Sequence, residues 1–319
     1  MQVGLASLID AELASYVEES RAFYAARAAS RGADPSQPDP RTPEGLREAR
    51  ALEERRASAA AASTPASSAA VEALAEAEGR RVPVRIVAPR SGKPRAVYVD
   101  VHGGGFYMGL AARGDAINRR LADGLGIAVV SVEHRLAPEH PWPAAPEDCE
   151  TAALWLLDEA ESRFGTTCMA IGGVSAGATL AMTTLLRLRD RGVVDSFVGA
   201  VLQCGTYDLS GQTPAGRLLD GEFFIDAYAG GVADRTNPDC SPVYGDVRGL
   251  PPVLIVVGSA DVLLEDNLVM AARLSAAGGE VDVRVYPRSP HGFTLHPTAM
   301  AGRALSDVES WLAARLLAT

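Results

Sequence analysis

The sequence predicts an α/β protein with a mostly parallel central sheet flanked by helices, and two observations indicate this class. Short runs rich in β-branched residues alternate with longer stretches of helical periodicity. The composition agrees, because 319 residues, 47% of them hydrophobic, with 31 Gly and 20 Pro, suit one large α/β domain with an appendage better than two independent domains. In such a sheet ligands bind at the carboxyl ends of the strands, so functional residues are expected in the loops there.

Seven strands and five helices are expected along the chain. The strands are Val82–Val87, Ala96–Val101, Ile127–Val132, Met169–Gly173, Val198–Gln203, Val253–Val257 and Val281–Tyr286. The helices are Ala111–Leu125, Ala144–Arg163, Ala176–Arg189, Leu264–Ala277 and Met300–Leu317.

Two segments lie outside this alternation. Residues 1 to about 60 precede any strand and have apolar residues at helical spacing, namely Leu5, Leu8, Ile9, Leu13 and Val17. The Ala/Ser/Thr tract Ala57–Ala70 fits either a helix end or a mobile linker. Residues 206–245, rich in Gly, Asp and aromatics, read as an excursion that could join the N-terminal helices in a lid. The expected divisions are therefore 1–65, 66–205, 206–245 and 246–319.

Charge and cysteine usage exclude some classes of function. A formal net charge of -10 argues against a nucleic-acid partner, because phosphate binding depends on clustered Lys and Arg. Cys149, Cys168, Cys204 and Cys240 are spread singly, which fits neither a zinc site nor a disulfide framework and favours reduced thiols in the cytoplasm. The N-terminus lacks a basic and then apolar signal pattern, and no apolar run has the length of a membrane helix, so a soluble protein is expected.

The first candidate motif is Gly173-Val174-Ser175-Ala176-Gly177, between an expected strand and an expected helix. This is the GxSxG pattern of a nucleophile elbow, where a tight turn leaves no room for side chains at the glycines and strains the serine. The N–H of Ala176 and the helix dipole favour a developing negative charge there. A structural glycine-rich turn is the alternative, so the surrounding motifs decide the role of Ser175.

A second motif, His102-Gly103-Gly104-Gly105-Phe106, directly follows the strand expected at Ala96–Val101. Backbone N–H groups stabilise an oxyanion best when no side chain blocks their approach, and consecutive glycines give that access. We expect the N–H groups of Gly104, Gly105 and Ala176 to form an oxyanion hole, with His102 and Gly103 ordering the loop. The alternative is a flexible glycine turn in which His102 is incidental.

A nucleophilic serine needs a base. In this kind of fold the acid and then the histidine follow the serine along the chain, which leaves His291 and His296. His291 comes just after the last expected strand, in a loop with Pro290 and Gly292, and is favoured. His296 reads as a surface or pocket residue.

The base in turn needs an orienting acid, and Asp261 follows the strand expected at Val253–Val257. Its alternative role is to cap the next helix. Glu265 and Asp266 lie farther along the chain and read as first-turn charges that favour the helix N-terminus. Ser175, Asp261 and His291 are therefore the expected catalytic residues.

These motifs resemble those of the hormone-sensitive-lipase-like esterases (bacterial family IV), which belong to the α/β-hydrolase superfamily. The resemblance runs from about residue 80 to the C-terminus and is carried by five blocks. They are His102–Gly105, the stretch His134–Ala145 (similar to the family's YRLAPE segment), Gly173–Gly177, Gly258–Asp261 with Leu263, and His291–Phe293.

The resemblance implies an α/β-hydrolase fold with a helical cap made by residues 1–65 and 206–245. It implies a serine carboxylic ester hydrolase that acts on short-to-medium acyl esters through an acyl-enzyme intermediate, with a small-molecule ester as its partner. No cofactor or metal is expected. A homodimer is possible. Arg135 and Glu139 have a supporting role only. Five aromatic residues are candidates to line the substrate pockets, although core packing is their default role: Phe23, Tyr24, Phe223, Phe224 and Tyr228.

Three positions depart from the family pattern. Val174 replaces an acidic residue, His134 replaces a Tyr and Val262 replaces a Pro. None of these changes removes a catalytic atom. Two other functions stay open: an amide, carbamate, lactone or thioester hydrolase with the same triad, and a non-catalytic binding protein of the same fold.

Overall fold

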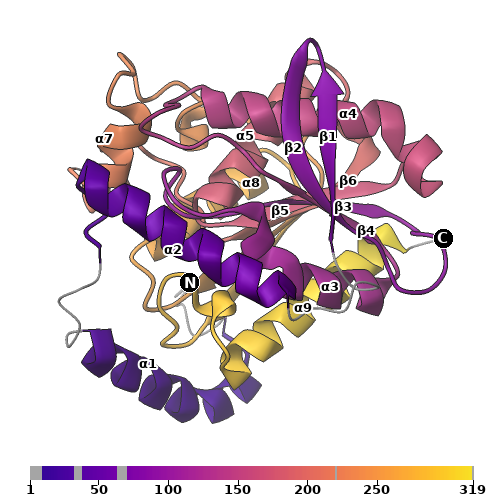
Figure 1. Cartoon of the computed structure of the whole chain (residues 1–319). Helices are drawn as coiled ribbons and strands as arrows, with labels where there is room; N and C mark the ends of the chain where they lie inside the picture. Colours follow the sequence, from indigo (N-terminus) through magenta and orange to yellow (C-terminus); the bar gives the residue numbers. More distant parts are fainter. Residues whose placement is uncertain (1–8, 32–37, 63–69, 220, 318–319) are drawn as a thin grey trace.

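The computed structural model describes residues 9–31, 38–62, 70–219 and 221–317. Its centre is an eight-stranded sheet with the strand order β1-β2-β4-β3-β5-β6-β7-β8 (Figure 1). The strands are β1 (Val71–Ala77), β2 (Arg80–Val87), β3 (Val97–Val101), β4 (Ala128–Val132), β5 (Met169–Val174), β6 (Phe197–Gln203), β7 (Val253–Gly258) and β8 (Val281–Tyr286). All pairings from β4 to β8 in this order are parallel, whereas the β1–β2 and β2–β4 pairings are antiparallel, so only β2 runs against the other strands. The predicted fold class is confirmed.

Helices cover both faces of the sheet (Figure 1). The α-helices are α1 (Val17–Arg31), α2 (Pro43–Ala62), α3 (Asp115–Leu125), α4 (Ala144–Phe164), α5 (Ala176–Asp190), α6 (Pro214–Arg217), α7 (Phe223–Ala229), α8 (Leu264–Ala276) and α9 (Ala299–Leu316). Successive side chains of a strand point to opposite faces. Accordingly Val97 and Val99 of β3 pack with the α4, α5 and α8 side, and Tyr98 packs with α3 and α9.

Strand β1 was not predicted from the sequence. It is rich in Ala and Glu, which favour helices, and lies at the sheet edge with only Ala75 fully buried, so its periodicity is weak. Its partner β2 follows after a two-residue turn in which Glu78 and Gly79 both have positive φ, 48° and 76°. Such a turn matches the twist of a hairpin, so the pairing is set locally.

The N-terminal segment is helical where it is described. A 3-10 turn (Ala11–Tyr16) leads into α1, and Leu13 is buried against the α3 and α9 side of the sheet. Leu5 and Leu8 lie outside the described residues. Helix α2 continues to Ala62, so the first part of the Ala57–Ala70 tract is a helix end. Residues 63–69 lie outside the described part of the chain.

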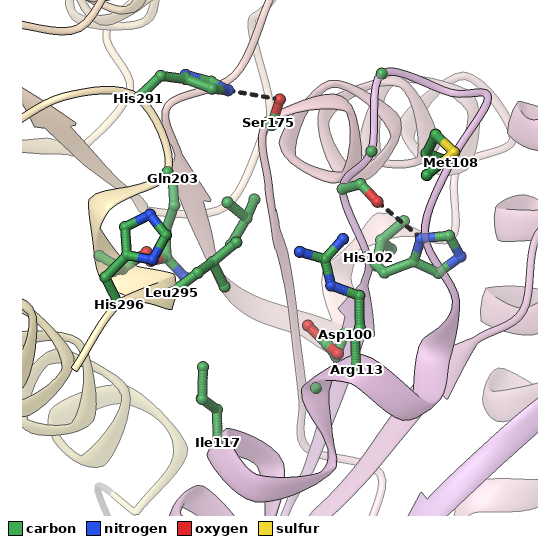
Figure 2. A pocket seen from close by; sticks show the side chains of 18 of the residues that line it. Asp100, His102, Met108, Arg113, Ile117, Ser175, Gln203, His291, Leu295 and His296 are labelled. Atoms are coloured by element: carbon green, nitrogen blue, oxygen red, sulfur yellow. Dashed lines mark hydrogen bonds between the residues drawn. The ribbon is translucent and has the colours of Figure 1, made fainter. Parts of the chain in front are cut away.

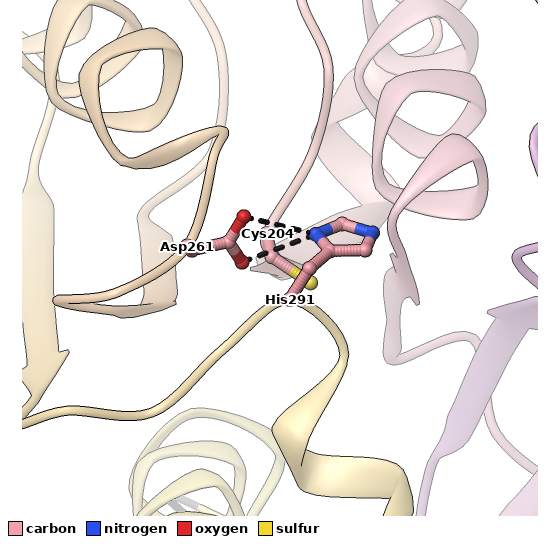
Figure 3. Close-up of side chains that lie close together, drawn as sticks. All are labelled: Cys204, Asp261 and His291. Atoms are coloured by element: carbon pink, nitrogen blue, oxygen red, sulfur yellow. Dashed lines mark hydrogen bonds and ion pairs between the residues drawn. The ribbon is translucent and has the colours of Figure 1, made fainter. Parts of the chain in front are cut away.

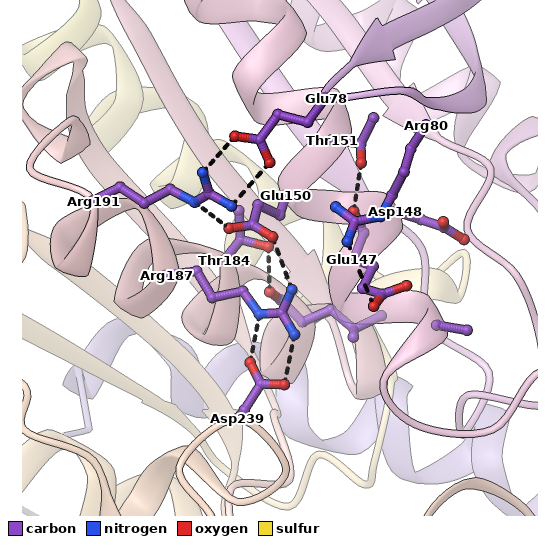
Figure 4. A network of polar contacts seen from close by, with 12 residues as sticks. Glu78, Arg80, Glu147, Asp148, Glu150, Thr151, Thr184, Arg187, Arg191 and Asp239 are labelled. Carbon is purple, nitrogen blue, oxygen red and sulfur yellow. Dashed lines mark hydrogen bonds and ion pairs between the residues drawn. The ribbon is translucent and has the colours of Figure 1, made fainter.

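The excursion 206–245 contains α6, α7 and a 3-10 turn (Pro242–Tyr244), and a network of charges holds it to the core (Figure 4). Arg187 of α5 pairs with Asp239 of the excursion and, at 2.9 Å, with Glu150 of α4. Arg191 joins Glu150 to Glu78 in the hairpin turn, at 2.7 and 2.6 Å. Burial acts to lower the pKa of Arg187, but its two carboxylate partners outweigh burial and raise it, so the guanidinium stays charged. Within the described residues, no helix has the length and apolar character needed to cross a membrane.

Candidate active site

Ser175 occupies the turn between β5 and α5 with φ 57° and ψ -125°, a backbone conformation that L-residues rarely adopt. The two glycines of the motif are needed for space. A Cβ on Gly173 would lie 2.4 Å from the carbonyl oxygen of Val101, and one on Gly177 would lie 2.0 Å from the same oxygen. The chain therefore passes close to β3 on both sides of Ser175, and the strained turn presents the serine at the carboxyl edge of the sheet.

His291 and Asp261 stand beside this serine. The Nε2 atom of His291 lies 2.9 Å from Oγ of Ser175, and its Nδ1 lies 3.0 and 3.1 Å from the carboxylate oxygens of Asp261. Asp261 also accepts a hydrogen bond from the N–H of Leu263 at 2.9 Å and is buried. The three residues that the sequence predicted as catalytic thus form one hydrogen-bonded chain. With Nδ1–H donated to Asp261, Nε2 is left as an acceptor for the serine proton.

Cys204 was not predicted to be part of this site. It follows β6, is buried, and its Sγ lies with the ligand atoms of Asp261 and His291 inside a group spanning at most 4.8 Å (Figure 3). Burial alone would lower the pKa of His291, but the contacts with Asp261 and Cys204 outweigh burial and raise it. In the described residues this is the one such group close enough to share a metal ion. The nitrogen and carboxylate of His291 and Asp261 are hydrogen-bonded to each other, as in a base and its orienting acid.

The glycine loop lies beside the serine, because a Cβ on Gly103 would be 3.4 Å from Cβ of Ser175 and both line the same cavity. Gly104, Gly105 and Phe106 all have positive φ, at 129°, 60° and 65°. A Cβ on Gly104 would lie 2.0 Å from the carbonyl oxygen of Met108, so no larger residue fits. Among the described residues, none accepts a hydrogen bond from the N–H of Gly104, Gly105 or Ala176. These three groups are therefore available to an oxyanion.

His102 is buried beneath this loop and stacks on His134, with ring centroids 4.0 Å apart. Burial, together with the neighbouring imidazole of His134, holds the pKa of His102 well below its ordinary value, and burial also lowers the pKa of His134. Neutral His102 can donate its Nδ1–H to the carbonyl oxygen of Gly103 at 3.0 Å. His134, which stands where the family pattern has a Tyr, thus stacks on His102 beneath the glycine loop.

A cavity of about 950 Å³ opens in front of Ser175 and His291 (Figure 2). Its lining comes from both the sheet and the segments that flank it, including α1, α2, the excursion, α3 and α9. Asp100 lies in its wall, where its carboxylate accepts hydrogen bonds from Asn118 at 2.9 Å and Ser131 at 3.1 Å. Burial raises the pKa of the Asp100 carboxyl. Two of the family departures, Val174 and Val262, also line the cavity.

The expected pocket aromatics have different positions. Phe224 lines the cavity, whereas Tyr228 is fully buried and stacks on Phe106 at 4.0 Å, so Tyr228 has the default role of core packing. Phe223 contacts Tyr107 edge-on. Phe23 and Tyr24 pack against His296, with ring centroids 5.7 and 5.6 Å away, and His296 lines the cavity, whereas the ring that bonds Oγ of Ser175 is that of His291.

Asp266 lies in the first turn of α8, as expected, and it is also buried and accepts hydrogen bonds from the N–H groups of Tyr207 and Asp208. Burial raises the pKa of its carboxyl to about 7, although the two N–H donors act to lower it. Arg135 binds Asp148 at the start of α4 through its N–H at 2.8 Å and its guanidinium.

Comparisons with known proteins agree with this arrangement. A family model described as an alpha/beta hydrolase fold matches residues 98–295. The carboxylic ester hydrolase LipN of Mycobacterium tuberculosis is 34% identical over 228 residues, which are 66% of this chain and 61% of LipN. This chain therefore matches less than two thirds of that relative's length.

Solved structures give longer matches. A hormone-sensitive lipase from a metagenome library has 31% identity and a TM-score of 0.69 over 82% of this chain and 92% of its own. A hyperthermophilic esterase from the archaeon Pyrobaculum calidifontis has 27% identity and a TM-score of 0.80 over 90% and 96% of the two chains.

Proposed function

This chain belongs to the alpha/beta hydrolase fold family, and from that premise we propose that it is a serine carboxylic ester hydrolase of the hormone-sensitive-lipase-like branch. The observation that carries the proposal is the hydrogen-bonded chain from Asp261 through His291 to Oγ of Ser175. The N–H groups of Gly104, Gly105 and Ala176, for which no described residue is an acceptor, support it. A nucleophile, a base with its orienting acid, and oxyanion donors are the parts that acyl transfer requires. Its similarity to LipN and to solved esterases supports the ester as substrate.

The reaction has two steps. Nε2 of His291 takes the proton from Oγ of Ser175 as the oxygen attacks the ester carbonyl. The oxyanion that forms accepts hydrogen bonds from the N–H groups of Gly104, Gly105 and Ala176. His291 then gives its proton to the departing alcohol, which leaves the acyl group on Ser175. Water, deprotonated by the same nitrogen, attacks the acyl group and releases the carboxylic acid.

Asp261 keeps Nδ1 of His291 protonated and stabilises the imidazolium between the two proton transfers. The raised pKa of His291 follows from this role, because the hydrogen bond with Asp261 favours the charged form of the ring. His102 and Gly103 order the oxyanion loop. No residue in this scheme requires a cofactor or a metal ion.

We further propose that α1, α2 and the excursion 206–245 act as the cap, since each contributes residues to the cavity wall: Arg27, Glu53, Leu219 and Phe224. A short-to-medium acyl ester is the proposed substrate. Every residue assigned to the reaction comes from one chain, so the homodimer left open above is not needed for chemistry. A net charge of -10 supports a small-molecule partner over a nucleic acid. The four free cysteines support a cytoplasmic location.

Two experiments test the proposal. A fluorophosphonate probe should label Ser175 in the folded wild-type protein and should not label Ser175→Ala. Absence of labelling in folded wild type would exclude a serine hydrolase. A panel of p-nitrophenyl esters of graded acyl length should then give the highest kcat/KM with short to medium chains. Faster turnover of matched amides or lactones would instead reassign the leaving group.

A further inference from the structure

We propose that Arg50 and Glu53 of α2 are positioning residues for the oxyanion loop, defined here as residues 102–109. Through them α2, which precedes every strand in the chain, holds the N–H donors of Gly104 and Gly105 where the reaction needs them. The inference rests on the proposed function for its catalytic consequence. Its structural basis is independent of that function.

The oxyanion loop has a backbone that cannot stabilise itself. Gly104, Gly105, Phe106 and Gly109 have positive φ, and at Phe106, a bulky residue, this conformation is costly. A segment of this kind forms neither a helix nor a strand, so its buried carbonyl and N–H groups need partners elsewhere. Where those partners come from determines what holds the loop in place.

Some partners come from the loop and its core neighbours. The carbonyl oxygen of Gly103 receives Nδ1–H of His102 at 3.0 Å, and that of Gly104 receives the N–H of Met108 at 2.9 Å. The carbonyl oxygen of Phe106 receives the N–H of Ala137 at 2.9 Å. The Tyr107 carbonyl oxygen and the Gly109 N–H instead find their partners in side chains of α2.

Arg50 satisfies the Tyr107 carbonyl with two donors. Its Nε and Nη2 lie 2.9 and 2.7 Å from that oxygen, and Nη2 also donates to the Ala137 carbonyl oxygen at 2.6 Å. Its Nη1 pairs with Glu139 at 2.9 Å. One planar guanidinium thus ties the loop to the neighbouring His134–Ala145 stretch. The ammonium of a lysine has no such fork of fixed donors.

Glu53 satisfies the Gly109 N–H. Its Oε2 accepts that hydrogen bond at 3.0 Å, and its Oε1 pairs with Arg113 at 2.9 Å. Gly109 lies directly against the start of the loop, because a Cβ placed on it would be 2.2 Å from the carbonyl oxygen of Gly103. Holding Gly109 therefore limits the movement of Gly103 and of the donor that follows it.

Arg50 and Glu53 are three residues apart and so lie on one face of α2. Arg47, by contrast, keeps 66% of its side chain exposed and pairs with Glu44 of the same helix. Arg47 gives a matched control for the loss of an arginine from α2.

The catalytic effect should be large for contacts that touch no substrate. A misplacement of about 1 Å in an active-site group can cost on the order of 10²-fold in rate, and loss of one oxyanion donor costs about 10²–10³-fold in kcat. We expect Arg50→Met to lower kcat by roughly 10- to 100-fold while KM changes by less than about threefold, because the donors act on the transition state. Arg47→Met should retain wild-type kcat.

A transition-state analogue separates positioning from general damage. A trifluoromethyl ketone, which forms an oxyanion on Ser175, should bind Arg50→Met more weakly by about the same factor as the loss in kcat. An unreactive substrate analogue should bind both proteins equally. Glu53→Met should weaken binding of the ketone as Arg50→Met does; Arg50→Met is the variant for the comparison with the unreactive analogue, because Glu53 also lines the cavity. Arg50→Lys keeps the charge but loses the fork, so it tests the same contact if Arg50→Met folds poorly.

Hydrogen exchange gives a readout that needs no ester turnover. In wild type the amides of residues 107–109 should exchange more slowly than in Arg50→Met or Arg50→Lys, while Arg47→Met matches wild type. Unchanged exchange, or an unchanged kcat in folded variants, would overturn the inference and leave the proposed function standing. If wild type shows no hydrolase activity, the proposed function fails, and hydrogen exchange still decides whether α2 holds the loop.

Discussion

The N–H of Ser175 donates a 2.8 Å hydrogen bond to the carbonyl oxygen of Gln203, the last residue of β6. The next residue, Cys204, lies against Asp261 and His291. Two consecutive residues at one strand end therefore support the strained backbone of the proposed nucleophile and the side chains of its two proposed partners. The geometry of the site depends on the end of β6 as well as on the motif around Ser175.

The strained backbone at Ser175 predicts a gain in stability when the side chain is removed completely. At φ 57° and ψ -125° a Cβ is unfavourable, and a strained residue of this kind costs about 1–3 kcal/mol. Ser175→Gly should therefore be more stable than Ser175→Ala by about 1 kcal/mol, because only glycine adopts this conformation freely. Urea denaturation measures the difference. Both variants should lose ester turnover by about 10⁶-fold, the scale seen for a missing serine nucleophile. Equal stability of the two variants would mean that the turn is not strained.

The contact between Asp261 and His291 predicts a shift in the pH dependence of turnover. Only neutral His291 accepts the serine proton, so activity rises as pH increases through its pKa. Burial lowers that pKa, but Asp261 and Cys204 outweigh burial and raise it, which places the acid limb of the profile above that of an ordinary imidazole. Asp261→Asn should move the limb to lower pH. It should also reduce kcat on the order of 10⁴-fold, since the tautomer is no longer fixed.

Cys204 contributes to the same shift without taking part in the proposed proton transfers. Cys204→Ala should move the acid limb of kcat/KM to lower pH while leaving the contact between Asp261 and His291 in place. The limb should not move in Cys168→Ala, because Cys168 lies at the far end of β5 from the serine and contacts the carbonyl oxygen of Leu316. A limb that stays in place in Cys204→Ala would show that the thiol does not influence the base.

The surroundings of Gly104 and Gly302 predict that an added methyl group is harmful to kcat at the first position and stabilising at the second. A Cβ on Gly104 would lie 2.0 Å from the Met108 carbonyl oxygen at a φ of 129°, so Gly104→Ala should distort the oxyanion loop and lower kcat by about 10²-fold or more. A Cβ on Gly302, inside α9, meets nothing within 4 Å. Gly302→Ala should raise the free energy of unfolding by about 0.5–1 kcal/mol through helix propensity and leave kcat unchanged. Comparable losses of stability in both variants would contradict this difference.

The charge network in Figure 4 predicts a large loss of stability when its centre is removed. Arg187→Met removes an ion-pair partner from both Glu150 and Asp239. The side chain of Glu150 is only 6% exposed. Breaking a buried ion pair from one side typically costs about 3–5 kcal/mol. We expect a loss of about 3 kcal/mol in chemical denaturation. Glu78→Gln changes an exposed end of the same network and should cost less than about 1 kcal/mol. Similar small costs for both variants would show that the network adds little.

Much of the fold could be predicted from the sequence because its signals are local. The expected strands are short runs rich in apolar and β-branched residues, and they recur in the structure within about two residues of the expected bounds. Ser175, Asp261 and His291 could be named because each lies in a loop after such a strand. The structure brings the three within hydrogen-bonding distance.

The remaining features depend on contacts that leave no local signal. Strand β1 has the composition of a helix and is specified by its turn and its partner β2. The burial of Asp266 depends on the backbone of Tyr207, and the position of Cys204 depends on two other loops. Sequence reasoning also missed Arg50 and Glu53, since a charged residue on an amphipathic helix reads as a solvated face.

The contacts of α2 also constrain how the chain can fold during synthesis. Arg50 is 57 residues before Tyr107 and 87 before Ala137, so a ribosome makes the helix well before it makes the groups that the helix binds. Most of the stability of a helix in a protein comes from tertiary packing, which α2 lacks until its partners are made. Helix α2 should therefore settle late, after β3 and the turn beyond β4 have left the ribosome, and the oxyanion loop should be among the last parts of the enzyme to become ordered.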